Sequence, residues 1–137
     1  MTRPYNKEDI NFVLYNDDCV EVINNLDKCT VDLIFADPPY FLSSGRTVRY
    51  NGNKKNIYKG EWDETKSLDE INSFNRRWLS ACREVMKDGA TIFATGTYHN
   101  IFSIASCMME LGFKILNIIV WQKTDAKPTL SRNYFKF

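Results

Sequence analysis

The amino-acid sequence predicts an α/β fold with a mostly parallel sheet, and three observations support this. Apolar runs of strand length alternate along the chain with longer segments whose apolar residues recur at helical spacing. The run at 31–36 shows almost no alternation of polar and apolar residues, which predicts a strand that is buried on both faces and pairs in parallel. The tetrad Asp37-Pro38-Pro39-Tyr40 follows that run directly. Open α/β sheets bind their ligands at such strand ends.

The 137-residue chain is long enough for one domain with a substantial core. The expected elements are strands at 11–15, 31–36, 90–95 and 113–121 and helices at 18–26, 68–88 and 101–111. Ser67 and Glu70 predict a capping box at the start of the long helix, and Gly112 is expected just beyond the last one. The segment 38–66 is too rich in Gly, Asn and Lys to predict an element, and so long a loop is usually functional or disordered.

Composition excludes several classes of protein. The formal net charge is +1, so bulk charge does not indicate a nucleic-acid partner. No apolar run reaches the length of a membrane span and the first residues do not resemble a signal peptide, so we expect a cytoplasmic protein without membrane contact. The four cysteines lack Cys-x-x-Cys spacing, and His99 is the single histidine. We therefore expect no metal site.

The tetrad suits methyl transfer to an exocyclic base amine, whose lone pair is conjugated into the ring and is a poor nucleophile. Such an amine needs acceptors for its N–H groups, and the Asp37 carboxylate and the Pro38 carbonyl are candidates. Pro38 and Pro39 restrict the backbone, while Tyr40 offers a face on which an extruded base can stack. The alternative is a simple strand-ending turn, since Asp and Pro both favour turns.

The tetrad resembles that of the amino-methyltransferases of DNA, which carry (Asp/Asn/Ser)-Pro-Pro-(Tyr/Phe/Trp) at the end of a central strand. Three further segments, at 16–22, 60–63 and 121–123, are similar to other motifs of the family. The order of the motifs resembles the circularly permuted β group, and within it the adenine methylases of GATC-type restriction–modification systems. The resemblance implies a Rossmann-like fold, S-adenosylmethionine as methyl donor and DNA as substrate, in a bacterial, archaeal or phage protein. Asp37, Pro38, Pro39 and Tyr40 are then the catalytic residues.

The Asp form of the tetrad implies N6-adenine methylation. Two other interpretations stay open. One is a non-catalytic nucleic-acid-binding remnant, and the other is an amino-methyltransferase that acts on cytosine N4, RNA or protein.

The glycine-rich turn that normally approaches S-adenosylmethionine is missing, because the six glycines never form Gly-x-Gly. The resemblance places that turn, and the target-recognition region, beyond residue 137. We therefore expect an incomplete sheet in which 1–137 is the catalytic part of the domain, completed by a C-terminal half or a second subunit. By resemblance, Asp17 or Asp18 contacts the cofactor together with Asp37. Helix N-capping explains Asp17 or Asp18 equally well.

A basic loop beside the tetrad is the candidate DNA contact. Arg46, Arg49, Lys54 and Lys55 lie in a stretch without acids and could grip a phosphate backbone. The loop, about 41–66, is expected to be mobile. On composition alone a solvated flexible loop is an equal alternative, and the position beside the tetrad favours the DNA contact. The resemblance gives Trp62 and Asp63 a role in closing over the base. Trp121 is expected in the core or at a sheet edge more than in a pocket.

Overall fold

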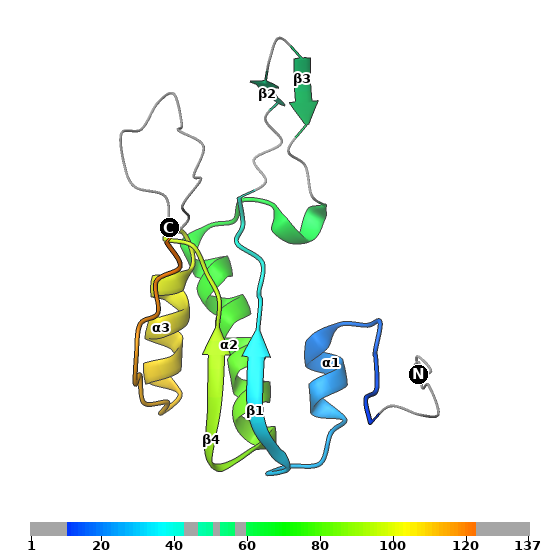
Figure 1. The fold of residues 1–137 in the computed structure, drawn as a ribbon, viewed down its shortest axis with the longest axis vertical. Helices are drawn as coiled ribbons and strands as arrows, with labels where there is room; N and C mark the ends of the chain where they lie inside the picture. The colour runs from blue at the N-terminus through cyan, green and yellow to red at the C-terminus, as the bar shows by residue number, and fades with distance from the viewer. Residues whose placement is uncertain (1–10, 43–46, 51–52, 57–59, 123–137) are drawn as a thin grey trace.

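The computed structural model describes residues 11–42, 47–50, 53–56 and 60–122 (Figure 1). Its elements are α1 (Cys19–Asn24), β1 (Val31–Ala36), β2 (Thr47–Tyr50), β3 (Asn53–Asn56), a 3₁₀ turn η1 (Glu61–Asp63), α2 (Leu68–Val85), β4 (Met86–Ala94) and α3 (Ile101–Glu110). β1 and β4 form a two-stranded parallel sheet, and β2 and β3 form an antiparallel hairpin. The predicted α/β class and the parallel pairing are confirmed.

Local sequence signals set the helix ends. The Ser67 hydroxyl accepts a hydrogen bond from the Glu70 N–H at 3.3 Å, and the Glu70 carboxylate accepts one from the Ser67 N–H at 2.9 Å, so the predicted capping box is present. α3 ends at Glu110, and Gly112 has the positive φ of 80° that favours glycine after a helix. α2 ends at Val85, three residues before the predicted end, because Met86 already has an extended backbone and begins β4.

The sheet packs through one face onto α2. Ile34 and Ala36 of β1 and Ile92 and Ala94 of β4 contact the core. This core consists of one residue of α1, four of α2 and three of α3, namely Val20, Trp78, Leu79, Ala81, Cys82, Ile104, Cys107 and Met108. α2 passes behind the sheet in Figure 1, and α1 and α3 flank it. We call the face of the sheet that contacts α2 the covered face.

The other face of the sheet is exposed, so the predicted burial on both faces is wrong. Leu33 and Phe35 of β1 are 59% and 70% exposed, and Phe93 of β4 is 43% exposed. The strand composition suits two covering layers, but no helix among the described residues packs on this side (Figure 1). We call Leu33, Phe35 and Phe93 the bare face.

Two predicted strands do not form. Residues 11–15 contain only an isolated bridge at Leu14, and 113–121 has no regular secondary structure. A strand requires a hydrogen-bonded partner, and β1 and β4 pair only with each other in the described part of the chain. Phe113 packs against the core, whereas Ile118 and Trp121 are 86% and 78% exposed. The prediction of a core or sheet-edge position for Trp121 is therefore also wrong. No helix among the described residues is long and apolar enough to cross a membrane.

Candidate active site at the carboxyl end of the parallel sheet

The carboxyl ends of β1 and β4 meet, and Asp37 and Thr95 follow them directly. The register pairs Ala36 with Ala94, and the Thr95 N–H donates to the Ala36 carbonyl at 2.9 Å. Parallel pairing therefore brings the first residue of the tetrad beside the first residue after β4. Thr95 was not among the predicted site residues. Its position as the last residue of the predicted strand 90–95 was the available signal.

Asp37, Tyr40 and Thr95 form a polar triangle. The Tyr40 hydroxyl donates to Asp37 Oδ1 at 2.7 Å, and the Thr95 hydroxyl donates to the same oxygen. The two hydroxyl oxygens lie 3.1 Å apart. A carboxylate only accepts, so each hydroxyl can donate to Asp37 and hold its carboxylate in one orientation, and the two hydroxyls also lie within hydrogen-bond distance of each other.

Tyr40 remains a proton donor at neutral pH. The hydrogen bond with Thr95 lowers the pKa of Tyr40, but burial and the Asp37 carboxylate raise it, and the net shift is upward. Asp37 itself lies at the exposed surface. The site therefore presents an oriented carboxylate to solvent at the end of the sheet.

The tetrad's backbone is held by two buried side chains from elsewhere in the chain. Asn100, the N-cap residue of α3, donates from Nδ2 to the Pro39 carbonyl at 2.9 Å. Asp63 Oδ1 accepts from the Tyr40 N–H at 3.2 Å and from the Leu42 N–H at 3.5 Å. Asp63 was predicted to close over a base, but in the structure it contacts the backbone of the tetrad loop. Its neighbour Trp62 is 58% exposed.

The two acidic residues predicted to contact a cofactor lie at the start of α1. Asp18 is the N-cap, and its Oδ1 accepts from the Val20 N–H at 2.9 Å and the Glu21 N–H at 3.3 Å. Its Oδ2 pairs with Arg77 of α2 at 3.1 Å. Asp17 Oδ1 accepts from the Asp18 N–H at 2.9 Å. The predicted capping role of Asp18 is present, and in Figure 1 the start of α1 points in the same direction as the carboxyl end of β1.

The predicted DNA-contacting residues lie in or next to the β2–β3 hairpin, which extends from the same end of the sheet as the tetrad (Figure 1). Arg49 is on β2, and Lys54 and Lys55 are on β3, where the register pairs Arg49 with Lys54. Arg46 lies outside the described residues. The predicted mobile loop, about 41–66, thus contains a hairpin and the η1 turn, and parts of it also lie outside the described residues.

Comparison with known proteins decides the family. A family profile described as DNA methylase matches residues 31–136, which include the tetrad and both strands of the parallel sheet. The chain belongs to this family. The resemblance inferred from the tetrad is therefore confirmed at the level of the family.

Three relatives match this chain over nearly all of its length. The Type II methyltransferase M2.LlaDCHI of Lactococcus lactis subsp. cremoris is 42% identical over 135 residues, M2.MboI of Moraxella bovis 39% over 136, and M2.DpnII of Streptococcus pneumoniae 40% over 135. Each match covers 98% of this chain and 50% of the relative. The chain therefore spans about half the length of the curated relatives it matches.

Packing explains the glycine that follows Thr95 at the end of β4. A Cβ atom at Gly96 would lie 3.1–3.3 Å from the side chain and Cα of Ile101. Gly96 therefore makes room for Ile101, the first residue of α3.

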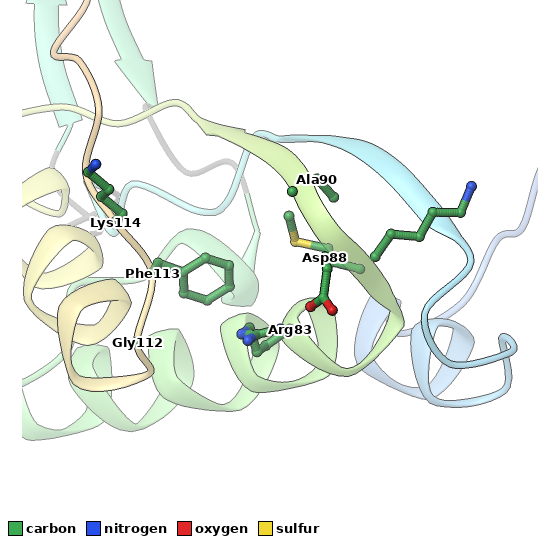
Figure 2. A pocket seen from close by; sticks show the side chains of 9 residues that line it. Arg83, Asp88, Ala90, Gly112, Phe113 and Lys114 are labelled. Carbon is green, nitrogen blue, oxygen red and sulfur yellow. The ribbon is translucent and has the colours of Figure 1, made fainter.

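A shallow hollow of about 170 Å³ lies at the other end of β4 from Thr95 (Figure 2). Phe113 lies on one side of the hollow, and Arg83 and Asp88 lie on the other. The hollow thus lies at the opposite end of the sheet from the tetrad. Among the described residues, no three His, Cys, Asp or Glu side chains come together as a metal site would require.

Proposed function

We propose that this chain is the catalytic part of an S-adenosylmethionine-dependent DNA methyltransferase that modifies adenine N6 in a restriction–modification system. The observation that carries the proposal is the Asp37 carboxylate, oriented by two hydroxyls at the carboxyl end of a parallel sheet in a DNA methylase. The relatives named Type II methyltransferases support the restriction–modification context. The Asp form of the tetrad supports adenine as the base.

In the proposed reaction, Asp37 and the Pro38 carbonyl accept hydrogen bonds from the exocyclic N–H groups of a flipped adenine. These bonds strengthen as the nitrogen becomes tetrahedral and gains charge, so they favour the transition state over the ground state. Tyr40 fixes the carboxylate through its hydroxyl and offers its ring to the base. No general base is needed before transfer, because the N–H proton can leave afterwards.

S-adenosylmethionine supplies an electrophilic methyl group on a sulfonium. The residues of this chain that the structure describes fit only part of that molecule. Asp17 and Asp18 offer carboxylates for its polar groups, but Asp18 is already engaged with the α1 backbone and Arg77. Gly96 packs against Ile101. We propose that the glycine turn and the target-recognition region belong to the half of the related enzymes that this chain does not match.

The same proposal accounts for the sheet. We propose that β1 and β4 are two strands of a larger Rossmann-like sheet, and that the remaining half of the methylase domain packs against the bare face. The β2–β3 hairpin, with Arg46, Arg49, Lys54 and Lys55, is the proposed contact with the DNA backbone. A non-catalytic DNA-binding protein would retain the hairpin without needing the polar triangle.

The test is transfer of labelled methyl from S-adenosylmethionine to DNA by this chain combined with the C-terminal half of M2.DpnII, with the methylated nucleoside identified by chromatography. We expect N6-methyladenine. Asp37→Ala should reduce the rate about a hundredfold or more, because the transition state then lacks a charge-assisted acceptor. Asp32→Ala is the matched control, since Asp32 lies on the same strand and pairs with Lys87 away from the tetrad. Normal turnover of Asp37→Ala with saturating DNA would exclude Asp37 from the mechanism.

A further inference from the structure

The peptide group between Pro39 and Tyr40 is held from both sides by buried side chains. Its carbonyl accepts from Asn100 Nδ2 at 2.9 Å, and its N–H donates to Asp63 Oδ1 at 3.2 Å. The two holding residues are 0% and 2% exposed. Neither belongs to the tetrad, and each comes from a different part of the chain.

A chain of buried hydrogen bonds fixes the orientation of the Asn100 amide. The Trp78 indole can only donate, and its Nε1 donates to Asn75 Oδ1 at 3.0 Å. The Nδ2 of Asn75 must then face Asn100, and it donates to Asn100 Oδ1 at 2.8 Å. Asn100 Nδ2 therefore faces the Pro39 carbonyl as a donor. The tetrad is thus connected through three side chains to the middle of α2.

Asp63 holds the loop from the other direction. It lies in η1, directly after the segment that contains the hairpin, and its Oδ1 also accepts from the Leu42 N–H at 3.5 Å. A buried carboxylate requires such donors. Between its two donors, Phe41 has a positive φ of 55° and packs edge-on against Phe74, with ring centroids 5.6 Å apart. The backbone therefore contacts Asp63 just before and just after Phe41, whose own backbone is strained.

Asn100 and Asp63 restrict backbone torsions of the tetrad that the proline rings leave free. The rings of Pro38 and Pro39 fix their own φ angles. The peptide after Pro39 sets ψ of Pro39 and φ of Tyr40, and so decides where the Tyr40 hydroxyl meets Asp37. A small shift of this peptide would move Tyr40 away from the carboxylate that it orients at 2.7 Å.

We propose that Asn100 and Asp63 are positioning residues for methyl transfer, which clamp the Pro39–Tyr40 peptide so that Tyr40 and Asp37 keep their working geometry. The proposal rests on the proposed methyltransferase function for its kinetic consequences. The clamp on the Pro39–Tyr40 peptide can itself be measured without catalysis.

The variants are Asn100→Ala and Asp63→Ala, with Asn72→Ala as the matched control. Asn72 accepts from Ser103 at 2.5 Å in the same polar cluster but has no contact with the tetrad. Asp63→Asn serves as the rescue, because its amide oxygen can still accept from the Tyr40 N–H.

The first measurement is amide hydrogen exchange at Tyr40 and Leu42 in the full chain, read against the global free energy of unfolding of each variant. We expect Asn100→Ala and Asp63→Ala to speed exchange at Tyr40 by at least about tenfold beyond the change in global stability. Asn72→Ala and Asp63→Asn should leave Tyr40 exchange within the global change. Tyr40 exchange that only follows global stability in both Ala variants would overturn the clamp.

The second measurement is kcat and KM of methyl transfer in the combined assembly. Asn100→Ala and Asp63→Ala should lower kcat on the order of tenfold to a hundredfold, with KM for DNA and for S-adenosylmethionine within about threefold, because these variants disturb the geometry of the tetrad and leave the binding surface intact. Asp63→Asn should recover most of kcat. Unchanged kcat in both Ala variants would overturn the positioning role. Absence of methyl transfer in the unmodified assembly would instead count against the proposed function, while the exchange measurement would still decide the clamp.

Discussion

The two faces of the parallel sheet have similar apolar composition but different surroundings. Ile34, Ala36, Ile92 and Ala94 contact the helical core, whereas Leu33, Phe35 and Phe93 of the same strands are exposed. Strand composition alone therefore does not show which face of a sheet another layer covers. With relatives twice as long, the bare face is where we propose that the rest of the methylase domain packs.

The largest expected difference between the faces is in how much their side chains contribute to the free energy of unfolding. Leu79 is fully buried under the covered face, and Leu33 is 59% exposed on the bare face. Leu79→Ala should lower the free energy of unfolding by about 2–5 kcal/mol, since it removes buried apolar packing and leaves a cavity. Leu33→Ala should change it by less than about 0.5 kcal/mol. Chemical denaturation of the isolated chain measures both, and equal effects of the two substitutions would mean that the bare face is covered in solution.

A charge on the bare face should weaken the association of this chain with a C-terminal half, and not its own stability. Phe35→Arg should leave the unfolding free energy of the isolated chain nearly unchanged, but weaken its association with the C-terminal half of M2.DpnII by at least about tenfold, because the charge would have to be buried. Met109→Arg is the control, since Met109 is 61% exposed on α3, away from the sheet. Equal affinities for the two variants, measured by calorimetry, would show that the halves meet elsewhere.

The smallest expected effect is on DNA affinity, which we expect to depend on the hairpin and not on the bare face. Replacing Arg46, Arg49, Lys54 and Lys55 by Gln should lower the slope of DNA affinity against salt by about 0.9 for each phosphate that these side chains neutralise. Association between the halves should not change. Replacing the exposed Lys28, Arg76, Arg83 and Lys87 by Gln alters the net charge equally as a control. An unchanged salt slope in the hairpin variant would place the DNA elsewhere.

Local patterns predicted much of this fold. The Ser67–Glu70 capping box, the glycine after α3 and the parallel pairing of β1 and β4 all follow from short-range spacing and strand composition. The tetrad's place at a strand end was predictable for the same reason. The failed strand at 113–121 shows the limit, because a strand exists only when a partner is present, and its sequence does not reveal whether the partner is.

The residues that hold the tetrad were not predictable from local patterns. Asn75 and Asn100 are 25 positions apart and look like ordinary polar residues, yet each is fully buried against the other. Asp63 resembled a residue that faces a ligand, whereas its carboxylate accepts backbone N–H groups. Such roles depend on which donors the fold brings near a buried acceptor, and that information is long-range.

The central proposal is that this chain holds the base that accepts the methyl group, and that it does not bind the methyl donor by itself. Calorimetric titration of the isolated chain with S-adenosylmethionine, followed by a labelled-methyl assay on DNA with and without the C-terminal half of M2.DpnII, tests it most directly. We predict weak or undetectable binding and no transfer by the chain alone, and transfer once the second half is added. Stoichiometric binding together with methylated DNA from the isolated chain would contradict the claim.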